Sequence, residues 1–137
     1  MSLYTGTATA EGGRNGHVQT SDGLLKFDLS IPKGMGGPGR EGTTNPEQLF
    51  ASGYAACFGS AVDFVGGQKK LDTGGATVTV AVSIDKGDAG FELAAELTVR
   101  LPALDRATAE ALVAEAHQVC PYSKATRGNM PVTLKVA

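Results

Sequence analysis

The segment from Asn45 to Val65 constrains the fold more than any other part of the chain. Asn45 is a good helix cap, Pro46 fits the first helical position, and Glu47 favours the positive end of the helix dipole. The residues that follow are apolar or small on nearly every side of a helix, which is typical of a central, buried helix. We therefore expect a long helix around which the remainder of the chain packs.

Short strands are expected on both sides of this helix, because the hydrophobic residues there alternate with polar ones. Asp22-Gly23 is a strong signal for a hairpin turn. A second helix is expected to begin at Asp105 and to end before Pro121. This order predicts an α+β fold with a mostly antiparallel sheet, in one domain spanning residues 1–137. The expected strands cover 3–10, 17–20, 24–30, 76–84, 91–101 and 132–136.

Composition excludes several classes of function. Apolar residues make up 42% of the 137 residues and charged residues 19%, which favours a folded core over disorder. The net charge is −2 without a strongly basic stretch, so we expect no nucleic-acid partner. No apolar run approaches the roughly 20 residues that span a bilayer, and no signal peptide is recognisable, so we expect a cytoplasmic protein without a membrane partner. Structural disulfides are rare in that compartment, so two cysteines point to redox or nucleophilic chemistry.

The two cysteines differ in their local chemistry. Cys57 lies in the middle of the expected buried helix, where burial would raise its pKa and a reactive thiolate would need a fixed cation. Arg14, in a glycine-rich turn, is the best candidate for that cation. Cys120 directly precedes Pro121 and is expected at a helix N-cap, where the helix dipole lowers a thiol pKa. Local physics alone therefore ranks Cys120 as the nucleophile and Cys57 as a core residue.

Other interpretations remain open at this point. Cys57, His117 and Cys120 could form a zinc-binding or zinc-hydrolase site, since His117 and Cys120 are three residues apart on one helix face. Both cysteines could instead fill the core of a non-catalytic interaction protein. The Cys120-Pro121-Tyr122-Ser123 string is similar to a glutaredoxin motif without its second cysteine, but that motif belongs early in its fold and here only 131–137 could form a later strand.

Four strings, spread in order over nearly the whole chain, resemble the organic hydroperoxide resistance proteins, the peroxidase branch of the OsmC-like superfamily. The Asn-Pro-Glu-Gln and Cys-Pro-Tyr-Ser blocks are specific in combination. Lys124 stands where the family usually has Asn, and a cation there could favour a Cys120 thiolate. The strings are Gly12-Gly13-Arg14-Asn15-Gly16-His17, Thr44-Asn45-Pro46-Glu47-Gln48-Leu49-Phe50, Gly53-Tyr54-Ala55-Ala56-Cys57-Phe58, and Val119 to Asn129.

The resemblance implies a thiol peroxidase that reduces alkyl or fatty-acid hydroperoxides to alcohols, and it reverses the local ranking of the cysteines. Cys57 would be the peroxidatic cysteine and Cys120 the resolving cysteine, joined in an internal disulfide during turnover. Arg14, paired with Glu47, would stabilise the Cys57 thiolate. The resemblance further implies an intertwined homodimer, a lipoylated protein or dihydrolipoamide as reductant, and neither a metal nor a tightly bound cofactor.

Spacing raises one geometric question about this site. Glu47 and Cys57 are ten residues apart, which is about 15 Å along one continuous helix. A single arginine could not contact both Glu47 and Cys57 of one chain across that distance. Either the helix breaks near Gly53, which is the version we favour because glycine weakens helices, or Glu47 comes from the partner subunit.

Overall fold

A computed structural model describes residues 1–137 and divides the chain into two compact units, residues 1–49 and 50–137. The expectation of one domain stays a prediction.

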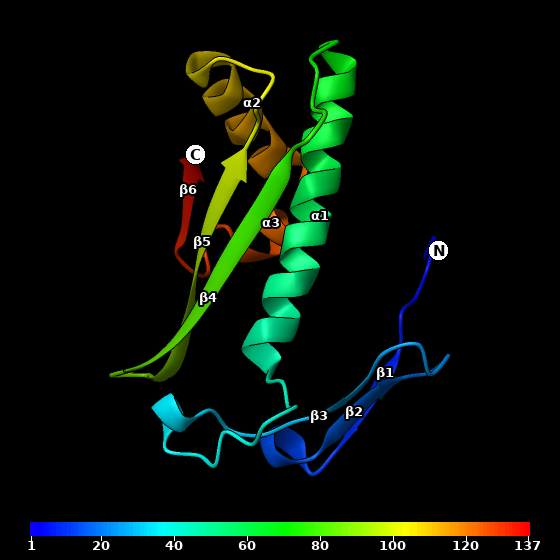
Figure 1. The fold of residues 1–137 in the computed structure, drawn as a ribbon, viewed down its shortest axis with the longest axis vertical. Helices are drawn as coiled ribbons and strands as arrows, with labels where there is room; N and C mark the ends of the chain where they lie inside the picture. The colour runs from blue at the N-terminus through cyan, green and yellow to red at the C-terminus, as the bar shows by residue number, and fades with distance from the viewer. The chain divides into compact units, whose positions relative to one another are not determined.

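The first unit is built on a three-stranded antiparallel sheet. Its strands are β1 (Ala8–Glu11), β2 (His17–Thr20) and β3 (Lys26–Asp28), in the order β1-β2-β3 (Figure 1). The expected turn at Asp22-Gly23 joins β2 to β3, and Gly23 has a φ of 71°, which favours glycine. Two short 3₁₀ turns, η1 (Gly13–Asn15) and η2 (Lys33–Met35), complete the unit.

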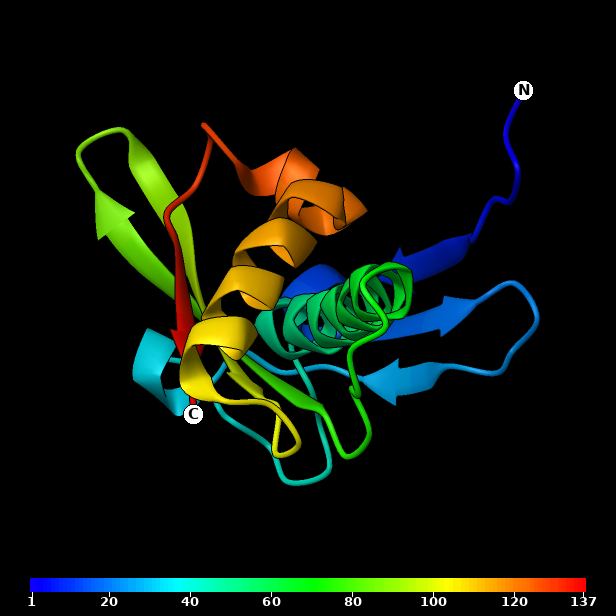
Figure 2. The ribbon, with the colours of Figure 1, turned by 90° about the horizontal axis from the view of Figure 1, so that it is seen from above.

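The second unit holds a three-stranded sheet covered on one face by helices. Strands β4 (Thr77–Gly87) and β5 (Gly90–Arg100) form a long antiparallel hairpin, and β6 (Val132–Val136) lies parallel to β5. Helices α1 (Pro46–Gln68) and α2 (Arg106–Val119) lie on the same face of this sheet (Figures 1 and 2). The short α3 (Pro121–Thr126) follows α2 directly. The α+β class with a long central helix is confirmed. The expected sheet is mostly antiparallel, and in this unit the pairing of β6 with β5 is the parallel one.

The helix termini follow the local chemistry of the sequence. The Asn45 side chain accepts a hydrogen bond from the Gln48 N–H at 2.9 Å, and Asp105 accepts one from Thr108 at 2.8 Å. Cys120 is the N-cap of α3, with Pro121 in the first helical position. Each of these boundaries was expected, because a capping side chain acts within three residues of the helix it caps.

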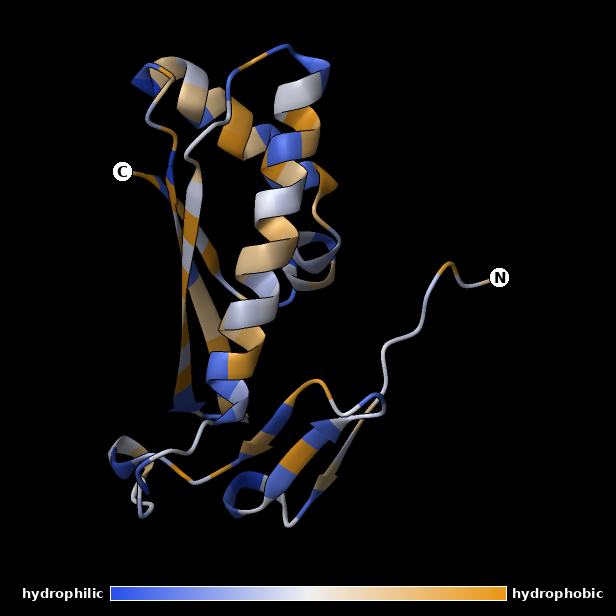
Figure 3. Ribbon diagram, turned by 45° about the vertical axis from the view of Figure 1, so that its right-hand side comes forward, coloured by the Kyte–Doolittle hydropathy of each residue, from blue (hydrophilic) through white to orange (hydrophobic).

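Burial of α1 differs from the expectation, because within this chain only one face of the helix is covered. Tyr54, Phe58, Val62 and Val65 are fully buried against β5 and α2, whereas Phe64 is 57% exposed. Figure 3 shows that apolar and neutral residues continue around much of α1 after its polar first turn. By length and hydropathy alone α1 could cross a membrane, contrary to the expectation that no segment would, but the core helix of a soluble protein meets the same criterion.

Candidate functional site

The two cysteines, 63 residues apart in sequence, lie in contact in the second unit. The Cys120 thiol donates to Cys57 Sγ over an Sγ–Sγ distance of 3.5 Å, and both cysteines are unbridged. Cys57 projects from the middle of α1, and Cys120 occupies the residue between α2 and α3. A disulfide bond has an S–S length of about 2.05 Å, so the two sulfurs are placed to form one after a small approach.

The surroundings of the two thiols differ in exposure. Cys120 is fully buried in the core, and Cys57 is only partly buried. Burial raises the pKa of the Cys57 thiol, a backbone hydrogen bond from Tyr122 partly offsets this rise, and the adjacent Cys120 adds to it. The Cys57 thiolate therefore needs further stabilisation from a positive charge before it can act as a nucleophile at neutral pH.

Helix α1 passes Gly53 without interruption, so the expected break there is wrong. Gly53 serves a different purpose, because a Cβ atom at this position would lie 3.1 Å from the Tyr122 hydroxyl oxygen. The glycine thus leaves room for the Tyr122 ring, which also makes an edge contact with Phe50 at a centroid distance of 6.3 Å. The hydrogen bonds of the flanking helix outweigh the roughly 1 kcal/mol by which glycine weakens it relative to alanine.

Arg14 and Glu47 form a two-pronged ion pair within the first unit. Arg14 donates from both terminal nitrogens to the two carboxylate oxygens of Glu47, at 2.9 and 2.7 Å. These hydrogen bonds lower the pKa of Glu47 and raise that of Arg14, so both remain charged over a wide pH range. The turn that carries Arg14 closes tightly at Gly16, where any side chain would overlap the Glu11 carbonyl. The expected pairing of Arg14 with Glu47 is found, and both residues belong to one chain.

The zinc alternative is not supported. Cys57 and Cys120 are together, but no group of three or more His, Cys, Asp or Glu side chains is arranged to hold a metal ion. His117 instead directs its Nδ1 toward Ser123 Oγ at 2.8 Å. Lys124 lies on the exposed side of α3.

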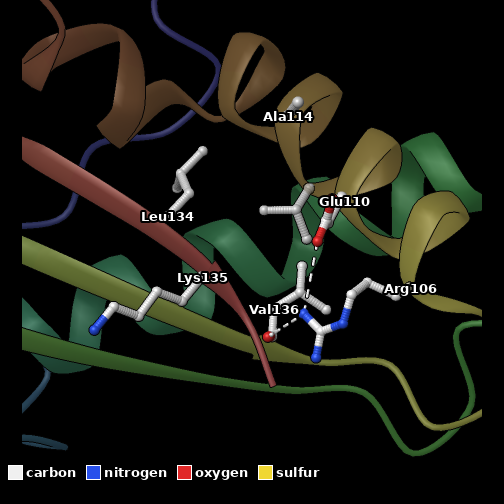
Figure 4. Close-up of a pocket in the computed structure, with 7 residues that line it drawn as sticks. Arg106, Glu110, Ala114, Leu134, Lys135 and Val136 are labelled. Atoms are coloured by element: carbon white, nitrogen blue, oxygen red, sulfur yellow. Dashed lines mark hydrogen bonds and ion pairs between the residues drawn. The ribbon is translucent and has the colours of Figure 1, made fainter.

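A separate pocket of about 490 Å³ lies between α2 and β6, and neither cysteine lines it (Figure 4). Arg106 donates there to the Val136 carbonyl at 3.1 Å and pairs with Glu110 at 3.6 Å. The charged groups of Arg106 and Glu110 in this pocket are thus already paired with residues that line it.

Sequence reasoning missed the polar residues beside the two thiols. Tyr54, on α1, and Ser123, on α3, are both fully buried, and their hydroxyl oxygens lie 2.8 Å apart. Thr126 joins the same cluster at 3.2 Å from the Tyr54 hydroxyl. The available signal was a tyrosine in an otherwise apolar helix, with two hydroxyl residues three apart in the short helix after Cys120.

Comparison with known proteins agrees with the fold described above. The OsmC-like protein family model matches residues 37–135. The organic hydroperoxide resistance protein of Xanthomonas axonopodis pv. citri is 50% identical over 98% of this chain and 95% of its own length. A crystal structure of an organic hydroperoxide resistance protein from Legionella pneumophila is 51% identical, with a TM-score of 0.93 over 100% of this chain and 99% of that one. The structure of OhrB from Bacillus subtilis is 44% identical, with a TM-score of 0.91 over 99% of this chain and 100% of that one.

These matches span nearly the whole chain, at identities well above the level at which two proteins share only a fold. They agree with the resemblance found in the four sequence strings. The chain belongs to the OsmC-like family and is similar, over almost all of its length, to the organic hydroperoxide resistance proteins.

Proposed function

We propose that this protein is a thiol peroxidase that reduces organic hydroperoxides, with Cys57 as the peroxidatic and Cys120 as the resolving cysteine. The observation that carries the proposal is the 3.5 Å contact between two thiols from distant parts of the sequence. The names of the relatives support the substrate class. The partial exposure of Cys57 and the burial of Cys120 support the division of roles, because an incoming peroxide must reach the first sulfur.

The reaction begins with the Cys57 thiolate. Its sulfur attacks the terminal oxygen of the hydroperoxide, the O–O bond breaks, and the alkoxide takes a proton to leave as an alcohol. Cys57 is oxidised to a sulfenic acid. Cys120 sulfur then attacks the Cys57 sulfur, so that the S–S bond forms, the S–O bond breaks and water leaves with the Cys120 proton. The apolar surroundings of Cys57 favour bulky organic peroxides over hydrogen peroxide, which loses more hydration on entry.

Arg14, oriented by its two hydrogen bonds to Glu47, supplies the positive charge that the Cys57 thiolate needs. Because α1 is unbroken, Glu47 and Cys57 of one chain are about 15 Å apart along its axis. Both terminal nitrogens of Arg14 bind Glu47 of the same chain. We therefore propose that the intact pair of one protomer serves Cys57 of its partner in a homodimer. This replaces both versions expected from the sequence, a break of the helix near Gly53 and a Glu47 that comes from the partner subunit to pair with Arg14.

The reductant and the location remain predictions from the family resemblance and the sequence. A dihydrolipoyl group, free or on a lipoylated protein, would reduce the Cys57–Cys120 disulfide through two thiol exchanges. The cycle would run in the cytoplasm and would require no cofactor. Omitting dihydrolipoamide from a steady-state assay should limit each active site to one turnover. A full turnover rate with glutathione alone would contradict the predicted reductant.

The direct test is mass spectrometry of reduced protein treated with one equivalent of an organic hydroperoxide such as cumene hydroperoxide. We expect a single species with a Cys57–Cys120 bridge and one equivalent of alcohol. A matched sample treated with the corresponding alcohol serves as the control. Slow, equal alkylation of both thiols and no bridge after peroxide would instead indicate core cysteines without catalysis.

A further inference from the structure

A buried hydrogen-bond cluster lies beside the dithiol and has no role in the chemistry proposed above. At its centre is Ser123, whose hydroxyl oxygen lies 2.8 Å from the Tyr54 hydroxyl and 2.8 Å from His117 Nδ1. Tyr54 has a second partner in Thr126, at 3.2 Å. Ser123 and Tyr54 are both fully buried, so neither hydroxyl can turn to water if its partner is lost.

The cluster joins the same two parts of the fold as the cysteines do. Tyr54 lies three residues before Cys57 on α1, which places it on the same face one turn away. Ser123 lies three residues after Cys120, in the first turn of α3. The Tyr54–Ser123 hydrogen bond therefore runs beside the Cys57–Cys120 contact as a second link between α1 and α3.

His117 fixes Ser123 from the other side. It belongs to the last turn of α2, and its carbonyl accepts a hydrogen bond from Arg127, at the C-terminal end of α3. These two contacts hold the corner between α2 and α3 at which Cys120 lies. Burial and the charge of Arg127 lower the pKa of His117, so a neutral ring can accept the Ser123 proton at Nδ1.

We propose that Tyr54, Ser123 and His117 are positioning residues that hold Cys120 against Cys57 and thereby set the rate of disulfide closure. The proposal rests on the thiol-peroxidase function above. In the step concerned, the Cys57–Cys120 bond forms, the S–O bond of the sulfenic acid breaks, and the hydroxyl leaves as water with the Cys120 proton. Cys120 is oxidised and the Cys57 sulfur is reduced.

The rate of disulfide closure matters because further oxidation of the Cys57 sulfenic acid competes with it. A sulfenic acid that waits for its partner can react with a second peroxide to give a sulfinic acid, which a dithiol cannot reduce. Holding the two sulfurs 3.5 Å apart favours the intramolecular reaction, because small losses of alignment slow such reactions by one or two orders of magnitude.

Single-turnover kinetics on the full chain test the proposal. Reduced wild type, Ser123→Ala and Tyr54→Phe are mixed with cumene hydroperoxide, and quenched samples are analysed by mass spectrometry with dimedone to trap sulfenic acid. We expect unchanged peroxide consumption in the first turnover. Closure should slow about tenfold in Ser123→Ala, which loses both links, and less in Tyr54→Phe. Both variants should also form more sulfinic acid at high peroxide.

Two further variants separate positioning from general destabilisation. His117→Asn can keep a hydrogen-bonding atom near the Nδ1 position and should close faster than His117→Leu. Val113→Ala removes buried volume from α2 but none of the hydrogen bonds of the cluster, so it should lose stability but close at the wild-type rate. Equal closure in Ser123→Ala and wild type, or equal slowing in Val113→Ala, would overturn the proposal.

An equilibrium measurement tests the same idea without peroxide. The fraction of Cys57–Cys120 disulfide in glutathione redox buffers gives the effective concentration of one thiol at the other, which we expect to fall about tenfold in Ser123→Ala. An unchanged value would contradict the positioning role. If wild type forms no sulfenic acid with the peroxide, the proposed function fails, and this equilibrium still decides whether the cluster positions the thiols.

Discussion

The two cysteines of this protein meet at one contact but lie in opposite kinds of surroundings. Cys57 is partly exposed in the middle of the 23-residue helix α1, with a pKa raised by burial and partly offset by the Tyr122 N–H. Cys120 is fully buried at the corner between two helices, beside a cluster of hydroxyl groups. The difference separates the two requirements of a thiol cycle: one sulfur must be reached from outside, and the other must be held in place.

Exchanging each cysteine for serine tests this separation most strongly. In Cys57→Ser we expect peroxide reduction to fall about a thousandfold or more, because the attacking sulfur is gone. In Cys120→Ser we expect the first turnover to survive and cycling to stop, with a sulfenic acid left at Cys57. Alcohol release in a quenched-flow assay measures both. Substantial peroxide reduction by Cys57→Ser would contradict the division of roles between Cys57 and Cys120.

Arg14→Ala should have the next largest effect. It should lower the rate of Cys57 oxidation by about a hundredfold, because the thiolate loses its cation.

Mixed dimers then show which chain supplies the Arg14–Glu47 pair to each Cys57. In a dimer of one Arg14→Ala chain and one Cys57→Ser chain, one complete site forms only if the pair acts across the interface. We expect about half of the wild-type activity in the purified mixed dimer. A mixed dimer as inactive as its two parents would mean that the pair serves its own chain.

The Arg14–Glu47 pair should also give the first unit an acid-sensitive contribution to stability. The pKa of Glu47 is lowered in the folded chain, so this contribution is present above its unfolded value near 4.5 and is lost as the pH falls through the lowered pKa. At pH 7, Glu47→Gln should reduce the free energy of unfolding by about 1 kcal/mol, since the pair is partly exposed. Urea unfolding at several pH values measures this difference. A difference that persists well below the lowered pKa would contradict the ion-pair explanation.

Lys70→Gly, two residues after the end of α1, is expected to have the smallest effect on the thiol chemistry. Lys70 has a φ of 56°, in the left-handed region that suits glycine, so the substitution should stabilise the protein by about 1 kcal/mol. This raises Tm by about 3 °C in thermal unfolding. The rates of sulfenic acid formation and closure should not change. A change in either rate would mean that the reactivity of the thiols depends on overall stability and not on their local surroundings.

Features set by neighbouring residues were predictable from the sequence, and features set by distant residues were not. The caps at Asn45 and Asp105 and the turn at Gly23 depend on short-range chemistry, and each was found where expected. The role of Gly53 was misjudged because its reason is Tyr122, which is 69 residues further along the chain. No spacing rule brings Cys57 to Cys120 or Tyr54 to Ser123. The first pair was expected only through the family resemblance, and the second was not expected at all.

In the proposed peroxidase cycle, the complete burial of Cys120 has a consequence for how the disulfide is reduced. Once the disulfide has formed, an external dithiol can attack only the sulfur of Cys57, so the mixed disulfide forms there and Cys120 is the leaving thiol. Electrons thus enter through the same atom from which the peroxide removed them. In the proposed cycle, selectivity for the electron donor and for the oxidant would therefore both depend on access to the Cys57 sulfur, and a substitution that exposes this sulfur further should relax both together.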